Sequence, residues 1–311
     1  YARAHDASSQ RAVFTVELLD RYQNVMSAKT FTVTSHAWTK LTAILKSRKT
    51  DSEGSLRLVL NGTDGVDVDH VSLFPSDNWN GLRADLVQDL ADLNPGVLRF
   101  PGGCIVEGTD LETRYQWKNT IGPAENRPMN ENRWNNTYTD KYAPGYYQSL
   151  GLGFYEFFCL AEKIGAQPLP IISAGLACQF QNSSMDAHVP VDELGPYVED
   201  ALDLIEFANG SADSRWGRVR AEMGHPAPFG LKFLGVGNEQ WGPDFVEHLK
   251  PFVEQIRARY PEIKLIGSAG PYLGGEWFDE LWPAMRELGC DLVDEHYYSS
   301  ELFYERNADR Y

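Results

Sequence analysis

One stretch decides the fold class: residues 231–242, LKFLGVGNEQWG. Its first half, 231–236, has the length and apolar composition of a buried strand, and a helical segment over 243–259 follows it. A short apolar strand that runs directly into a helix is the repeating unit of a parallel α/β sheet. Polar residues stand between the two, where such folds place catalytic groups.

The same alternation extends in both directions from this stretch. Further strands are expected near 97–100, 167–172, 263–268 and 291–298, and further helices near 82–93, 151–164, 192–208 and 276–288. The expected fold over residues 75–311 is therefore α/β, a (β/α)8 TIM barrel. Five strands are fewer than the eight of a closed barrel, so we expect it to be incomplete. The segment RFPGGC after the first strand lacks the G-x-G-x-x-G order, which disfavours a dinucleotide-binding fold.

Residues 1–74 have a different texture. Short alternating runs at 12–19, 30–35 and 55–62, separated by polar turns, predict a β-sandwich segment. It resembles a carbohydrate-binding module, in which Trp38 could stack on a sugar. The alternative is a domain that only supports the barrel.

Composition narrows the classes of partner. Acidic residues number 44 against 28 basic ones, a formal net charge of −16, which disfavours nucleic acid and anionic membranes. No apolar run approaches the ~18 residues of a membrane span. The four cysteines lack metal-ligand spacing, so neither a metal nor another cofactor is expected. Four N-x-S/T sequons, at Asn61, Asn135, Asn182 and Asn209, favour a secreted glycoprotein.

The candidate catalytic residue is Glu239, directly after the strand at 231–236. Partial burial there would raise its carboxyl pKa and keep it protonated as a proton donor. Asn238 could hydrogen-bond a sugar hydroxyl, and Trp241 offers a face for a sugar ring. The alternative is an ordinary loop glutamate that caps the following helix.

Two other strand ends carry ionisable groups. Arg99, before Gly102 and Gly103, could hold a catalytic carboxylate ionised, or could form an ordinary salt bridge. His296 lacks partners at metal-ligand spacing, so we expect it to orient a carboxylate, with Tyr298 on the same face of the strand. The long aromatic loop 114–147 would shape a binding site over the barrel mouth.

Four segments together carry a family resemblance: LRFPGGCIVEG (98–108), RYQWKNTIGPAENRP (114–128), FLGVGNEQWG (233–242) and DEHYY (294–298). They resemble the α-L-arabinofuranosidases of glycoside hydrolase family 51, over about 72–311. The resemblance implies retaining hydrolysis of terminal α-L-arabinofuranosyl groups from arabinoxylan or arabinan, substrates that are arabinose-containing polysaccharides and oligosaccharides.

The resemblance also implies residue roles. Glu239 would be the acid/base and Asn238 a sugar-hydroxyl contact, while Cys104 would lie against the sugar. Arg99 and Tyr298 would contact the nucleophile, which in this family is a Glu after barrel strand seven. By that count the strand lies beyond Tyr311, and the chain is expected to be a fragment that also lacks barrel strands one and eight. Glu295 is the rival nucleophile within the chain, although strand alternation should turn it away from His296 and Tyr298.

Two other functions stay open at this point. One is another glycosidase of the same clan, an endoglucanase or xylosidase. The other is a carbohydrate-binding protein without turnover.

Overall fold

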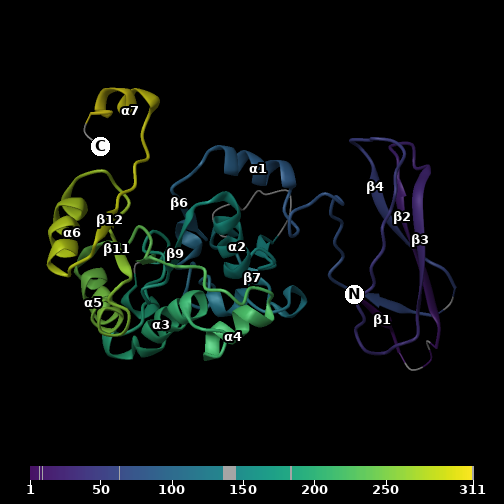
Figure 1. The fold of residues 1–311 in the computed structure, drawn as a ribbon, viewed down its shortest axis with the longest axis horizontal. Coiled ribbons are helices and arrows are strands. Elements are labelled where there is room, and N and C mark those ends of the chain that lie inside the picture. Colours follow the sequence, from purple (N-terminus) through teal and green to yellow (C-terminus); the bar gives the residue numbers. More distant parts are fainter. Residues whose placement is uncertain (7, 9, 63, 136–144, 183, 310–311) are drawn as a thin grey trace. The chain divides into compact units, whose positions relative to one another are not determined.

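The computed structural model describes residues 1–6, 8, 10–62, 64–135, 145–182 and 184–309 (Figure 1). The chain divides into two compact units, Tyr1–Ser76 and Asp77–Tyr311. The loop expected over 114–147 includes residues 136–144, which lie outside the described residues.

The first unit consists of antiparallel strands, as the alternating pattern predicts. One sheet has the order β3-β2-β4 and the other pairs β1 with β5. The strands are β1 (Ala2–Ala4), β2 (Ala12–Leu19), β3 (Val25–Val33), β4 (Ser55–Leu60) and β5 (Val66–Val68). Phe14 and Phe31 face each other across β2 and β3 with ring centroids 5.5 Å apart, and they anchor a small apolar core.

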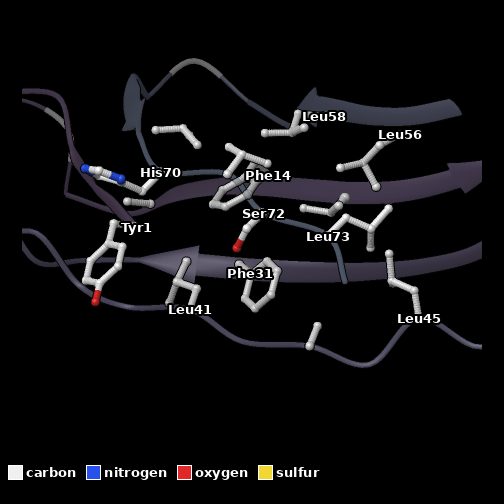
Figure 2. Close-up of a pocket in the computed structure, with 15 residues that line it drawn as sticks. Tyr1, Phe14, Phe31, Leu41, Leu45, Leu56, Leu58, His70, Ser72 and Leu73 are labelled. Atoms are coloured by element: carbon white, nitrogen blue, oxygen red, sulfur yellow. The ribbon is translucent and has the colours of Figure 1, made fainter. Parts of the chain in front are cut away.

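This unit also contains an apolar pocket of about 140 Å³, lined mainly by aliphatic side chains around Phe14 and Phe31 (Figure 2). Trp38 is not among the lining residues, and the guanidinium of Arg3 lies 4.8 Å from its ring centroid. One face of Trp38 is therefore already covered by a cation. The pocket holds no cluster of carboxylates, so glycoside chemistry has to be sought in the second unit.

The second unit is built on a five-stranded parallel sheet of order β12-β11-β10-β9-β6. Its strands are β6 (Val97–Phe100), β9 (Gln167–Ile172), β10 (Phe233–Val236), β11 (Lys264–Ser268) and β12 (Leu292–Asp294). All five fall within a residue or two of the expected positions, except that the last strand ends at Asp294 instead of 298. Residues 295–298 do not pair with a neighbouring strand, because β11 ends at Ser268, which is paired with Asp294.

The sheet curves as a barrel does. Arg99 in β6 and Asp294 at the end of β12 form an ion pair of 2.9 Å, although three strands separate them in the sheet order. In a flat sheet these strands would lie about 19 Å apart, four spacings of ~4.8 Å, beyond the reach of an arginine. The structure is therefore an incomplete (β/α)8 barrel preceded by antiparallel sheets, which confirms the predicted fold class.

Helices connect and cover these strands (Figure 1). They are α1 (Ala84–Asp92), α2 (Phe154–Ile164), α3 (Gly195–Asn209), α4 (Arg215–Glu222), α5 (Gly242–Arg259), α6 (Glu276–Glu287) and α7 (Glu301–Asn307). The core lies between helices and sheet, where Phe100 of β6 packs against Phe154, Phe157 and Phe158 of α2 at centroid distances of 5.0–5.3 Å. The helices thereby fix the strand ends that carry the polar residues.

Two helices, α4 and α7, were not predicted from the sequence. In α4, RWGRVRAE, three arginines and a glutamate leave no visible apolar stripe. Arg220 is nevertheless fully buried, and it donates to four backbone carbonyls, those of Phe207, Gly210, His225 and Pro226. A charged side chain thus takes the core position that an apolar residue normally marks.

Asn209, one of the four sequons, ends α3. Its side-chain amide donates to the Leu231 carbonyl at 2.9 Å, and its oxygen accepts from the Leu231 amide at 2.7 Å. Both polar atoms are occupied, so this asparagine ties the end of α3 to the segment before β10.

Among the described residues, we find no helix with the length and apolar composition needed to cross a bilayer.

Candidate active site

The six predicted site residues come together at the carboxyl ends of the parallel strands, where barrel folds place their active sites. Arg99 belongs to β6, and Cys104 to the 3₁₀ turn Gly103–Ile105 that follows it. Asn238 and Glu239 follow β10, and His296 and Tyr298 follow β12. Residues up to 195 positions apart in the chain are thus in direct contact.

Glu239 is the centre of this cluster. It is 5% exposed, and both carboxylate oxygens are engaged. His296 Nδ1 and the Tyr298 hydroxyl each lie 2.7 Å from Oε1, and the Cys104 thiol donates to Oε2 at 3.4 Å. Three side chains from two other strands therefore fix the orientation of one carboxylate.

The backbone at Glu239 is strained. Its φ is +52°, in the left-handed region that non-glycine residues rarely adopt. At Gly237, φ is +82°, and a Cβ atom there would lie 2.5 Å from the Gln240 side chain and 2.7 Å from the Phe245 ring. Only glycine fits this turn, which aims Glu239 into the cluster. Strain of this kind costs about 1–3 kcal/mol and concentrates at functional sites.

The pKa of Glu239 lies below its ordinary value, which is the opposite of the sequence expectation. Burial does raise its pKa, as predicted, but the hydrogen bonds from His296 and Tyr298 and the charge of His296 together lower it more. In the arrangement described here, Glu239 is held as a carboxylate. The sequence predicted the effect of burial but not the hydrogen-bond donors, His296 and Tyr298, because these reach Glu239 only in the folded protein.

Arg99 is the second centre. Its Nη2 donates to Asn238 Oδ1 at 2.8 Å and to Asp294 Oδ2 at 2.9 Å, and its Nε donates to Asp294 at 3.1 Å. Arg99 thus holds a carboxylate ionised, as its position suggested, and that carboxylate is Asp294. The same guanidinium fixes the Asn238 side chain beside Glu239.

His296 links the two centres. Its Nε2 lies 3.2 Å from Asp294 Oδ2, and its Nδ1 lies 2.7 Å from Glu239 Oε1. The two carboxylates raise the pKa of His296 to about 9, so at neutral pH the ring is an imidazolium that donates to both. The histidine orients carboxylates, which is the role expected from the sequence.

Asp294 is the site residue that sequence reasoning missed. Burial raises the pKa of Asp294, but His296 and Arg99 together lower it by more than burial raises it. The pKa of Asp294 therefore lies below its ordinary value. The signal was present, because residues 294, 296 and 298 lie on one face of an extended chain. Glu295 points the other way, where it accepts a 2.5 Å hydrogen bond from the Trp282 indole of α6. It therefore has no place among the site groups.

Trp241 and two tryptophans of the loop expected over 114–147 lie in different environments. Trp241 does not offer a free sugar-binding face, since Trp277 stacks on it at 4.4 Å with rings 13° apart and Phe180 packs edge-on at 4.8 Å. Trp117 is buried in the core against Phe207. Trp134 is partly buried, and the Arg133 guanidinium lies 3.9 Å from its ring centroid. Trp241, two residues after Glu239, therefore forms a stacked pair with Trp277.

The four cysteines are free thiols, so none of them forms a disulfide. Cys104 and Cys178 are buried, and with the buried Glu107 they form a compact group in which one ligand atom from each residue lies within 4.8 Å of the others. Burial raises the pKa of Glu107 well above its usual value. No local motif marks this group in the sequence, because loops after two different strands contribute to it.

Known proteins are similar to this chain in sequence. The family model of the α-L-arabinofuranosidase 1 domain matches residues 89–311, more than two thirds of the chain. An extracellular exo-α-L-arabinofuranosidase of Streptomyces chartreusis is 42% identical across 100% of this chain and 37% of its own length. α-L-Arabinofuranosidase 1 of Arabidopsis thaliana is 38% identical across 74% of this chain and 32% of its own length.

A solved structure is also similar to this chain. The arabinose-bound MgGH51 α-L-arabinofuranosidase matches 100% of this chain and 48% of its own, with a TM-score of 0.81 and 27% identity. The chain spans about a third of the length of the two curated relatives. By the family model and by the similarity to these relatives, this chain belongs to the α-L-arabinofuranosidases of glycoside hydrolase family 51.

Proposed function

We propose that the full-length protein is a retaining glycoside hydrolase that releases terminal α-L-arabinofuranosyl residues, with Glu239 as its general acid/base. The observation that carries this proposal is the fixed, strained position of Glu239 among His296, Tyr298 and Cys104 at the carboxyl end of the sheet. Family membership supplies the sugar, since the MgGH51 relative is named as arabinose-bound.

The reaction needs two carboxyl groups about 5–5.5 Å apart. Glu239 protonates the leaving oxygen while the second carboxylate attacks the anomeric carbon. Glu239 then acts as base toward the water that releases the sugar. In this scheme Arg99 positions Asn238 for a sugar hydroxyl, and Cys104 borders the sugar.

The second carboxylate is proposed to come from residues outside this chain. Glu295 is bonded to Trp282 on the helical side. Asp294 Oδ2 already accepts three hydrogen bonds, two from Arg99 and one from His296, which weakens it as a nucleophile. A carboxylate brought within ~5.5 Å of Glu239 would raise the pKa of Glu239 by like-charge repulsion. It would also compete for the Tyr298 hydroxyl, and Glu239 would then gain the proton that an acid catalyst needs.

Substrate and location follow from the relatives and the charge. We propose arabinoxylan and arabinan, or oligosaccharides derived from them, as substrates, because a neutral polysaccharide meets no repulsion from a chain of net charge −16. Secretion is supported by the Streptomyces relative, whose name describes it as extracellular.

The test compares arabinose release by this 311-residue chain and by a chain extended to the length of its relatives, using a panel of aryl glycosides. We expect turnover only in the longer chain and only on the α-L-arabinofuranoside. Preference for an aryl glucoside or xyloside would favour another glycosidase. Binding of arabino-oligosaccharides by the longer chain without release would favour a non-catalytic protein.

Variants of the longer chain separate the roles. Glu239→Gln is expected to lower turnover of natural arabinoxylan about 10²–10⁴-fold, the usual contribution of a general acid. Glu295→Gln is the matched control, since its side chain faces α6, and it should keep its activity. Loss of activity in Glu295→Gln with activity retained in Glu239→Gln would reverse the assignment.

A further inference from the structure

A group of three reactive side chains lies beside Glu239, and two of them, Glu107 and Cys178, have no part in the proposed reaction. Cys104, Glu107 and Cys178 are 5%, 2% and 1% exposed. One ligand atom from each residue, the two sulfurs and a carboxylate oxygen, lies within 4.8 Å of the other two. Backbone bonds hold the group together, since the Gly108 amide donates to the Cys104 carbonyl at 3.1 Å and the Cys178 amide to the Gly108 carbonyl at 3.0 Å.

Glu107 points to a missing ligand. Its Oε2 atom is buried and accepts no hydrogen bond from the described residues. A buried acceptor left without a partner costs about 1–3 kcal/mol, and such an atom in a native structure needs a reason. A bound cation is a sufficient reason, because one carboxylate oxygen of Glu107 lies within 4.8 Å of both sulfurs.

The donor chemistry selects the cation. Two thiolates and one carboxylate form a donor set that suits zinc and other thiophilic ions, and not magnesium or calcium. With Zn–S near 2.3 Å and Zn–O near 2.0 Å, a tetrahedral site places these atoms about 3.5–3.8 Å apart. Since the atoms lie within 4.8 Å of one another, each pair has to approach by about 1.3 Å at most.

The charges also balance. The ionised ligands carry three negative charges, and a divalent ion leaves one of these uncompensated. Arg133 supplies the remaining positive charge, since its buried Nη2 donates to the Cys178 sulfur at 3.2 Å. A buried group is stable only when its charges are paired, and here the ion and one guanidinium pair all of them.

We propose that Cys104, Glu107 and Cys178 form a binding site for a thiophilic divalent cation of the zinc class. Cys104 also lies next to the acid/base site, because its sulfur is 3.4 Å from Glu239 Oε2. Metal binding itself does not depend on the proposed arabinosidase activity, so the two can fail separately.

The experiment uses the full-length protein, reduced and stripped with a chelator, and measures zinc bound at equilibrium dialysis by elemental analysis. We expect one equivalent of zinc per chain. Cobalt in its place should give a thiolate-to-metal charge-transfer band in the near ultraviolet. Cys178→Ser and the isosteric Glu107→Gln should each weaken zinc binding at least 10-fold, whereas Cys159→Ser and Cys290→Ser, which alter thiols outside the group, should bind as the wild type does.

A measurement on the unmutated protein guards against variants that fail to fold. Zinc should protect Cys104 and Cys178 from alkylation, read by mass spectrometry, relative to Cys159 and Cys290. The proposal is overturned if the wild type binds no more zinc than Cys178→Ser, or if zinc protects neither thiol. A third result also overturns it: the stripped protein forms a Cys104–Cys178 disulfide, and after that disulfide is reduced the protein still binds no metal.

Discussion

The hydroxyl of Tyr298 donates to Oε1 of Glu239 at 2.7 Å, although the tyrosine as a whole is 80% exposed and lies 59 residues further along the chain. This bond helps to keep Glu239 ionised, and it raises the pKa of Tyr298 to about 12. A solvent-exposed side chain thus helps to determine the protonation state of a buried carboxylate.

Tyr298→Phe should raise the pKa of Glu239, because the variant loses a donor that favours the charged form. In the full-length enzyme the alkaline limb of the kcat/KM profile should move to higher pH, since that limb reports the acid of the free enzyme. Tyr304→Phe is the matched control, because the Tyr304 hydroxyl donates to the Tyr297 carbonyl and does not touch Glu239. An unmoved limb in Tyr298→Phe would remove the tyrosine from this role.

His296 should titrate with a midpoint near pH 9, measured by NMR of its ring protons. Its folded-state pKa is raised above the ordinary 6.5, so its contribution to stability is fully present below pH 6.5 and is lost as pH rises through 9. The unfolding free energy should therefore fall across that window, and less steeply in His296→Gln. Asp294→Asn should bring the midpoint down; a midpoint that stays near 6.5 in the wild type would contradict the assigned ion pairs.

Asp294→Asn should also lower the unfolding free energy by about 1–3 kcal/mol, because it leaves the half-buried Arg99 guanidinium without its carboxylate. Urea denaturation measures this loss. Glu254→Gln, an exposed change on α5, should stay within about 0.5 kcal/mol of the wild type. Equal stabilities for the two variants would mean that the ion pair between β6 and β12 does not hold the curved sheet.

Arg220→Met should destabilise the second unit by about 3 kcal/mol or more, since four backbone carbonyls, one buried and three partly buried, lose their donor at once. Methionine fills a similar volume, so the loss reports hydrogen bonding more than packing. Arg218→Met is the control, because Arg218 is exposed on the same helix and donates to none of these carbonyls. It should change stability by less than about 0.5 kcal/mol. Thermal or urea unfolding distinguishes the two.

The sequence by itself determined the order of strands and helices in the second unit, because apolar periodicity records which face of each element is buried. It also located Glu239 at a strand end, and it placed His296 and Tyr298 on one face with Glu295 turned away, since side chains alternate along an extended chain. These features depend on neighbours within a few residues. Helix α4 was missed because its core position is held by Arg220, whose partners are backbone carbonyls that no sequence pattern displays.

Only the tertiary structure decided which side chains meet. The curvature of the sheet brings Arg99 onto Asp294 across three intervening strands, and the pairing of β6 with β9 places Cys178 beside Cys104 and Glu107. The tertiary structure also supplies the donors from His296 and Tyr298 that reverse the expected pKa shift of Glu239. A pKa is set by the charges and hydrogen bonds within a few ångströms of a group, and those neighbours are fixed by strand pairing and sheet curvature, not by local sequence.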